Sequence, residues 1–247
     1  MKSIMDMPVI IEIVDVITPE VLNELFDYFH WVDNTFSTFK PTSEISKLNT
    51  ILKAKPATRV ASLLSKDMQE ILRLAEQTKH ETNGYFDIRR GNMIDPSGIV
   101  KGWAIHNAAK LLKKMKLKNY YIEIGGDIEV AGHNSDGKPW TIGIRNPFNV
   151  REIVKVVSLM NKGIATSGTY ERGKHIYIPE INMQATEILS FTVIGPNVYE
   201  ADRFATAVFA MGKKGVQFIE SLKGFAGYMI NKEGIATMTS SFEKYLV

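Results

Sequence analysis

Residues 98–127, with the sequence GIVKGWAIHNAAKLLKKMKLKNYYIEIGGD, carry three structural signals in direct succession. Lysines close a helical pattern over about residues 100–117, where positive charge suits the negative end of a helix dipole. The apolar side chains of that pattern recur at helical spacing and are Ile105, Ala108, Ala109, Leu112 and Met115. The strand-like residues 119–124 follow at once, and Gly125-Gly126-Asp127 then predicts a turn.

The rest of the chain also mixes helical and strand patterns. Alternation over residues 9–14 predicts a first strand, and Thr18-Pro19 opens a helical apolar pattern that runs to residue 32. The further predictions are a helix from about 65 to Asn83-Gly84, strands over 140–144, 153–159 and 189–194, helices over 200–211 and 216–222, and short strands near Tyr228 and Ala236. Because strands come in consecutive groups as well as between helices, we expect an α+β fold with antiparallel sheets and packed helices, rather than a doubly wound parallel sheet.

Composition places the chain among ordinary globular proteins. Of its 247 residues, 45% are hydrophobic and 23% are charged. No stretch rich in Pro, Gly or Ser and no charge block separates two hydrophobic patterns, so we predict a single domain over residues 1–247. Thirty basic residues against 27 acidic ones give a formal net charge of +3, which is too balanced to indicate a nucleic-acid or membrane surface.

The absence of cysteine narrows the possible chemistry further. It excludes disulfides, thiolate metal sites and a cysteine nucleophile, and leaves oxygen and nitrogen ligands. Residues 1–16 lack the basic start and uninterrupted apolar core of a signal peptide, and no window reaches the roughly 18 apolar residues of a membrane span. We therefore expect a cytoplasmic protein without stable membrane insertion.

Asp202 and Thr206 are candidates for metal binding. Four residues apart at the start of a predicted helix, they share one face, and both offer the hard oxygens that Mg²⁺ prefers. The alternative is structural, since an acidic residue in a first helical turn usually stabilises the helix dipole and a threonine often has no special role.

Two further segments have the features of an anion site. In Thr166-Ser167-Gly168, hydroxyls beside a glycine permit close approach of backbone N–H groups to phosphate, although a plain turn after a strand explains the same residues. Residues 95–102 lie just before the predicted third helix, where Asp95 and Lys101 could meet a pyrophosphate and a metal ion. The segment lacks the order of a Walker loop, so a P-loop NTPase is not supported.

The five histidines show no spacing typical of a zinc site. His175 follows the Thr-Ser-Gly segment by only a few residues and could act there as a general base. For each histidine the plainer interpretation is a surface or hydrogen-bonded side chain. A Gly-x-Ser-x-Gly motif is absent from the sequence, which weakens the case for a hydrolase triad.

The order of these segments resembles the ApbE family of FAD:protein FMN transferases along nearly the whole chain. The similar blocks, in chain order, are residues 33–39 with Ser43-Glu44-Ile45 and Leu48-Asn49, then 83–87, 98–104, Gly125-Gly126-Asp127, Trp140 with Pro147, 165–168, and Ala201-Asp202 with Thr206. Each block is weak alone, but the ordered set is specific.

The resemblance implies a T-fold-like architecture, FAD in a cleft and Mg²⁺ at its pyrophosphate. Asp202 and Thr206 match the metal ligands of the family, with the backbone carbonyl of Gly98 as the third ligand. The matches to flavin-nucleotide contacts are Tyr85, Phe86, Asp87, Asp95 and Lys101, while Thr166 and Ser167 belong to the cleft motif. His175 matches the histidine that the family uses in transfer.

Three departures from the family pattern affect the predicted function. Residues 175–182 keep the histidine but lose the acid, threonine and glycine that follow it in the family, and His106 stands where the family usually has Asp. The chain also lacks the family's acceptor motif, so an acceptor must be another protein.

The resemblance thus predicts Mg²⁺-dependent transfer of FMN from FAD to a threonine or serine hydroxyl of a separate protein, with release of AMP. Two alternatives stay open. Water as the nucleophile would make the chain an FAD pyrophosphatase, and the altered segment after His175 is compatible with a non-catalytic FAD-binding protein. The sequence leaves the oligomeric state open.

Overall fold

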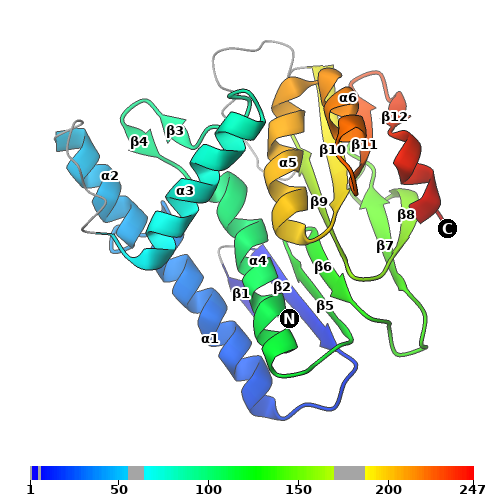
Figure 1. The fold of residues 1–247 in the computed structure, drawn as a ribbon, viewed down its shortest axis with the longest axis horizontal. Coiled ribbons are helices and arrows are strands. Elements are labelled where there is room, and N and C mark those ends of the chain that lie inside the picture. Colours follow the sequence, from blue (N-terminus) through cyan, green and yellow to red (C-terminus); the bar gives the residue numbers. More distant parts are fainter. Residues whose placement is uncertain (1, 5–6, 55–63, 170–186) are drawn as a thin grey trace.

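A computed structural model describes residues 2–4, 7–54, 64–169 and 187–247 of the chain. Its centre is an eight-stranded sheet in which every neighbouring pair is antiparallel (Figure 1). Across the sheet the strands are β1 (Lys2–Ile4), β2 (Met7–Ile13), β5 (Tyr120–Ile124), β6 (Asp127–Ala131), β9 (Lys162–Gly168), β10 (Ile188–Gly195), β11 (Ala226–Asn231) and β12 (Ala236–Met238).

Helices cover one face of this sheet, and a separate hairpin lies on the other face. The helices are α1 (Pro19–Phe36), α2 (Glu44–Ala54), α3 (Lys66–Glu81), α4 (Ser97–Lys114), α5 (Val198–Met211) and α6 (Lys214–Ser221), followed near the C-terminus by the 3₁₀ helix Ser240–Tyr245. The hairpin pairs β7 (Trp140–Arg145) with β8 (Ile153–Leu159), and a smaller one pairs β3 (Arg89–Arg90) with β4 (Met93–Ile94). The predicted α+β class with antiparallel sheets is confirmed.

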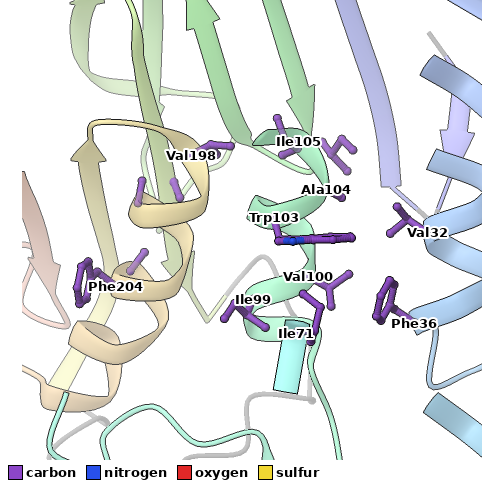
Figure 2. Close-up of a cluster of buried hydrophobic side chains, with 14 of the residues drawn as sticks. Val32, Phe36, Ile71, Ile99, Val100, Trp103, Ala104, Ile105, Val198 and Phe204 are labelled. Atoms are coloured by element: carbon purple, nitrogen blue, oxygen red, sulfur yellow. The ribbon is translucent and has the colours of Figure 1, made fainter. Parts of the chain in front are cut away.

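Two hydrophobic cores follow from this layering. The larger core lies between the sheet and the helices, and Figure 2 shows Trp103 of α4 extending toward Val32 and Phe36 of α1 within it. The smaller core lies between β6, β9, β10 and β11 on one side and the β7–β8 hairpin on the other, with Trp140 and Phe242 among its buried rings. Strands β6, β9 and β10 are therefore covered on both faces.

The sequence patterns miss two strands in the middle of the sheet and several shorter elements. Strand β6 has only five residues and begins directly after the glycine turn, and its first four residues are all buried, the charged Asp127 and Glu129 included. Strand β9 is rich in small residues and resembles a turn in sequence, although it occupies the middle of the sheet. Helix α2 and the β3–β4 hairpin are also absent from the predictions. The long helices and the turn after β5 are confirmed, and Gly125 and Gly126 both have positive φ, at 55° and 87°.

The first turn of α5 rests directly on strand β9, and a glycine makes this approach possible. A Cβ on Gly163 would lie only 1.9 Å from the backbone nitrogen of Val198. Glu129, the cross-strand partner of Gly163 on β6, accepts the Val198 N–H at 2.5 Å. Asn197 caps the helix by accepting the Glu200 N–H at 2.9 Å. These contacts fix where α5 begins above the sheet.

Replacing Gly163 by alanine is expected to push α5 off the sheet, because the nearest atoms are backbone and cannot rotate away. We expect a loss of more than about 3 kcal/mol in the free energy of unfolding, as for other severe overpacking in a core. Urea denaturation followed by circular dichroism measures this.

Gly137→Ala is the control for that variant. Nothing lies within 4 Å of a Cβ on Gly137, so an alanine there meets no clash. The remaining cost is the strain of its φ of 72°, about 1–2 kcal/mol. If Gly163→Ala cost no more than Gly137→Ala, the close contact between β9 and α5 would not be a constraint on the fold.

Candidate functional site

The candidate site forms where the first turns of α4 meet the middle of α5, two helices that lie side by side over the sheet (Figure 1). Gly102 donates its N–H to Oδ2 of Asp202 at 2.8 Å, and the carbonyl of Gly98 accepts the Thr206 hydroxyl at 3.4 Å. In a regular α-helix the Gly102 N–H would donate to the Gly98 carbonyl. Side chains of α5 thus contact both backbone groups of this pair.

The close approach of α5 leaves no room for a side chain at Gly102 and little at Gly98. A Cβ on Gly102 would lie 2.6 Å from Cβ of Asp202 and 2.8 Å from the carbonyl oxygen of Val198. A Cβ on Gly98 would lie 3.2 Å from Cγ2 of Thr206. The absence of side chains therefore lets α5 approach α4 closely enough to bring the three predicted metal ligands together.

The chemistry of this donor set fits a hard divalent cation. Asp202 is 1% exposed, and within the part of the chain that the structure describes no basic side chain forms an ion pair with it. Burying a carboxylate without a counter-charge is costly, so a cation beside it would compensate. No group of three or more His, Cys, Asp or Glu side chains gathers among the described residues, so such a site would use one carboxylate, one hydroxyl and one carbonyl.

A second cluster adjoins the first, because Lys101 precedes Gly102 on α4. Nζ of Lys101 lies 2.9 Å from Oδ2 of Asp127, and the two side chains are 12% and 0% exposed. The other carboxylate oxygen of Asp127 accepts the Thr166 N–H at 3.3 Å, and the Thr166 hydroxyl lies 2.8 Å from that of Thr192. Asp127 thus joins two predicted nucleotide contacts, Lys101 and Thr166, that belong to α4 and β9.

Asp127 is a residue whose role the sequence patterns did not predict. It is the last residue of Gly125-Gly126-Asp127, in which the two glycines alone predict the turn. Ser167, the next predicted contact after Thr166, is 5% exposed on the same strand.

The remaining predicted nucleotide contacts lie around the end of α3 and the β3–β4 hairpin. Phe86 is buried and packs against Gly98, with Cε2 3.4 Å from where a Cβ on Gly98 would be, while Tyr85 is half-buried. Asp87 forms an ion pair with Lys79 at 2.7 Å. Asp95 pairs with Arg90 at 3.3 Å and accepts the Ser97 N–H at 3.1 Å just before α4.

Asn49 of α2 anchors the β3–β4 hairpin, which leads directly to Asp95. Its side-chain amide donates to the Ile94 carbonyl at 2.8 Å, and its oxygen accepts the Ile94 N–H at 2.7 Å. A single buried side chain thus satisfies both backbone groups of the residue before Asp95. The only signal for it in the sequence is its place at the end of the block 43–49.

Of the two histidines at positions compared with the family pattern, the structure describes His106 but not His175. His106 lies on α4 with Nδ1 3.1 Å from Oε1 of Glu129, the carboxylate that also binds the first N–H of α5. His175, the predicted base, lies outside the described residues, as does the altered segment that follows it. In the described part of the chain, every helix is too short or too polar to cross a membrane.

Sequence comparison identifies relatives with a shared name. The sequence model described as the ApbE family matches residues 5–95 and 88–229. A Haemophilus influenzae relative named FAD:protein FMN transferase is 33% identical over 167 residues, which are 62% of this chain and 48% of that protein. A relative of the same name from Klebsiella pneumoniae is 31% identical over the same length and shares. The chain thus spans about half the length of these relatives.

Structural comparison shows the same architecture. The flavin transferase ApbE from Vibrio cholerae superposes with a TM-score of 0.80 at 23% identity, covering 99% of this chain and 97% of that one. The ApbE protein from Thermotoga maritima gives a TM-score of 0.82 at 18% identity and covers 100% and 98%. At such identities the likeness establishes the fold, and activity must be argued from the site. From the match of the family model over most of its length, the chain belongs to the ApbE family.

Proposed function

We propose that this chain transfers FMN from FAD to a threonine or serine hydroxyl of a separate acceptor protein, with Mg²⁺ as the metal and AMP as the leaving product. The observation that carries the proposal is the gathering of Asp202, Thr206 and the Gly98 carbonyl on facing turns of α5 and α4. Family membership and the name FAD:protein FMN transferase borne by its relatives support the reaction class.

The chain's own residues have separate tasks in this proposal. Asp202, Thr206 and the Gly98 carbonyl would hold Mg²⁺, which when bound supplies charge neutralisation at the pyrophosphate oxygens. Lys101 would add positive charge near the phosphates, and Asp127 fixes its ammonium 2.9 Å away while also binding the Thr166 backbone. The residues Tyr85, Phe86, Asp87, Asp95 and Ser167 would contact the flavin nucleotide around these phosphate-binding groups.

The chemical step exchanges one P–O bond for another. The acceptor hydroxyl oxygen bonds to the FMN-side phosphorus, the anhydride bond to the AMP phosphate breaks, and AMP departs with the bridging oxygen. His175 is proposed to take the hydroxyl proton, a role that typically contributes about 10²–10⁴-fold to a rate. Positioning and charge neutralisation supply most of the remainder in phosphoryl transfers.

One experiment separates this activity from its alternatives. The chain is incubated with FAD, Mg²⁺ and an acceptor protein containing Ser-Gly-Ala-Thr, and the products are followed by mass spectrometry and chromatography. A mass gain of one FMN minus one water on the acceptor supports transfer. AMP with free FMN indicates an FAD pyrophosphatase, and bound but unchanged FAD indicates a non-catalytic binding protein, either of which would overturn the proposal. Cytoplasmic residence stays a prediction from the sequence.

Asp202→Asn is expected to reduce Mg²⁺-dependent turnover by at least about 100-fold, because a neutral amide is a poor ligand for a hard cation. The fold should persist, since the amide oxygen can still accept the Gly102 N–H. Steady-state turnover of FAD across a Mg²⁺ titration measures the loss. The exposed Asp136→Asn serves as the control for removing one carboxylate. Normal turnover and Mg²⁺ dependence in Asp202→Asn would refute the ligand assignment.

Lys101→Met is expected to lower the free energy of unfolding by about 3–5 kcal/mol, because it removes the cation beside a fully buried carboxylate. The double variant Lys101→Met/Asp127→Asn should recover part of that loss. Both variants should bind FAD more weakly and with less salt dependence, since a charge near phosphate is gone. Urea denaturation and FAD titrations at low and high salt test this. A single variant as stable as the double variant would argue against the buried pair.

His175→Ala is expected to slow transfer by about 10²–10⁴-fold while leaving the affinities for FAD and Mg²⁺ nearly unchanged, as for a group that acts mainly in the transition state. Single-turnover transfer and equilibrium FAD binding measure the two quantities separately. His133→Ala, at an exposed position two residues after the end of β6, is the matched control. Transfer at the parent rate in His175→Ala would mean that another group is the base.

A further inference from the structure

Arg203 is a buried cation on α5 next to Asp202, and it ties α5 to the end of α3. Arg203 is 5% exposed. Its Nη1 donates to the carboxylate of Glu81 and, at 3.3 Å, to the hydroxyl of Thr78, both on α3. Its Nε and Nη2 donate to Glu200 on its own helix at 2.8 and 2.5 Å. The guanidinium also stacks over Phe204, with Cζ 4.0 Å from the ring centroid.

The charge of Arg203 is well compensated despite its burial. Burial by itself opposes the charged form, but Glu200 and Glu81 outweigh that cost and raise the pKa of Arg203 above its ordinary value. Burial likewise opposes charge on Glu81, yet hydrogen bonds from Gln77 and Arg203 lower the pKa of Glu81. The planar fork of arginine reaches both helices at once, which a lysine cannot reproduce.

A continuous line of contacts runs from this guanidinium to Phe86. The carbonyl of Thr78 accepts the Thr82 hydroxyl at 2.7 Å, and the oxygen of that hydroxyl accepts the Phe86 N–H at 3.1 Å. Phe86 packs against Gly98, whose other close neighbour is Thr206. Since Thr206 lies three residues after Arg203 on α5, the line of contacts returns to the helix from which it starts.

We propose that Arg203 is a positioning residue that holds residues 82–87 against α5, and that it sets the affinity of the chain for the flavin nucleotide without taking part in the chemical step. Both ends of the closed line of contacts lie on α5, so the helix that carries Asp202 and Thr206 also determines where Phe86 and its neighbours stand. The inference rests on the proposed function in taking FAD as the ligand.

The test uses the purified full chain with FAD and Mg²⁺. Arg203→Met removes the fork, Arg203→Lys keeps the charge, and Thr82→Val interrupts the line nearer to Phe86. The exposed Arg73→Met on α3 is the matched control. Three quantities are measured for each variant: the Kd for FAD by flavin fluorescence, the kcat at saturating FAD, and amide hydrogen exchange over residues 82–87.

Arg203→Met should raise the Kd for FAD about 10-fold while kcat stays within about twofold of the parent, and Arg203→Lys should lie between them. Exchange at Phe86 should accelerate in Arg203→Met and Thr82→Val but not in Arg73→Met. Combining Arg203→Met with Thr82→Val should raise the Kd no further than the worse single variant, because both changes break one line. If Arg203→Met fails to fold, Arg203→Lys and Thr82→Val still give the Kd and exchange comparisons.

Three outcomes would overturn the role of Arg203. The Kd for FAD could be unchanged in Arg203→Met, or kcat could fall only because part of that variant is unfolded while the folded part binds FAD as the parent does. The third outcome is a fully additive rise in Kd when Arg203→Met and Thr82→Val are combined. Failure of the proposed function is distinguishable, because then the parent itself neither binds nor converts FAD. In that case hydrogen exchange alone decides whether Arg203 holds residues 82–87. Faster exchange at Phe86 in Arg203→Met supports the positioning role, and unchanged exchange refutes it.

Discussion

The contact between Gly102 of α4 and Asp202 of α5 is the constraint on which the rest of the site depends. A carboxylate that is 1% exposed accepts a backbone N–H from a neighbouring helix at 2.8 Å, and there is no room for even a methyl group between the two helices. One turn before Gly102 on α4 and one turn after Asp202 on α5, the Gly98 carbonyl accepts the Thr206 hydroxyl. Buried polar groups between two helices normally form hydrogen bonds within the protein. In this contact between α4 and α5, which we call the seam, those bonds gather three hard oxygen donors, from Asp202, Thr206 and the Gly98 carbonyl.

The sheet beneath α5 holds that seam in place. Gly163 admits the first turn of α5 onto β9, and Glu129 on the adjacent strand receives the first N–H of the helix. Asp127, two residues before Glu129 on β6, binds the α4 lysine and the backbone of Thr166. Carboxylates on one strand therefore fix both helices, and the apolar side chains of the same strand pack into the smaller core on the opposite face.

The sequence predicts elements with a clear apolar period better than elements without one. Helices such as α1 and α4 have enough turns for an apolar period to emerge, whereas β6 has only five residues directly after a glycine turn and β9 consists largely of small residues. The site follows the same division. Asp202, Thr206 and Gly98 stand in ordered blocks that resemble the family, and the structure brings these three together. Arg203 and Asn49 act through partners up to 125 residues away, and no local pattern encodes such contacts.

The distance along the chain between the two halves of the seam has a consequence for how the protein is made. The bonds from Asp202 to Gly102 and from Thr206 to Gly98 join residues 100 and 108 positions apart. A nascent chain that ends before α5 already contains all of α4. The face of α4 that carries Gly98 and Gly102 then lacks the helix that packs on it. Contacts of this separation form late in folding, since a long loop must close before they stabilise anything. Until α5 has emerged from the ribosome, the unfinished layer exposes apolar surface of the kind that chaperones bind.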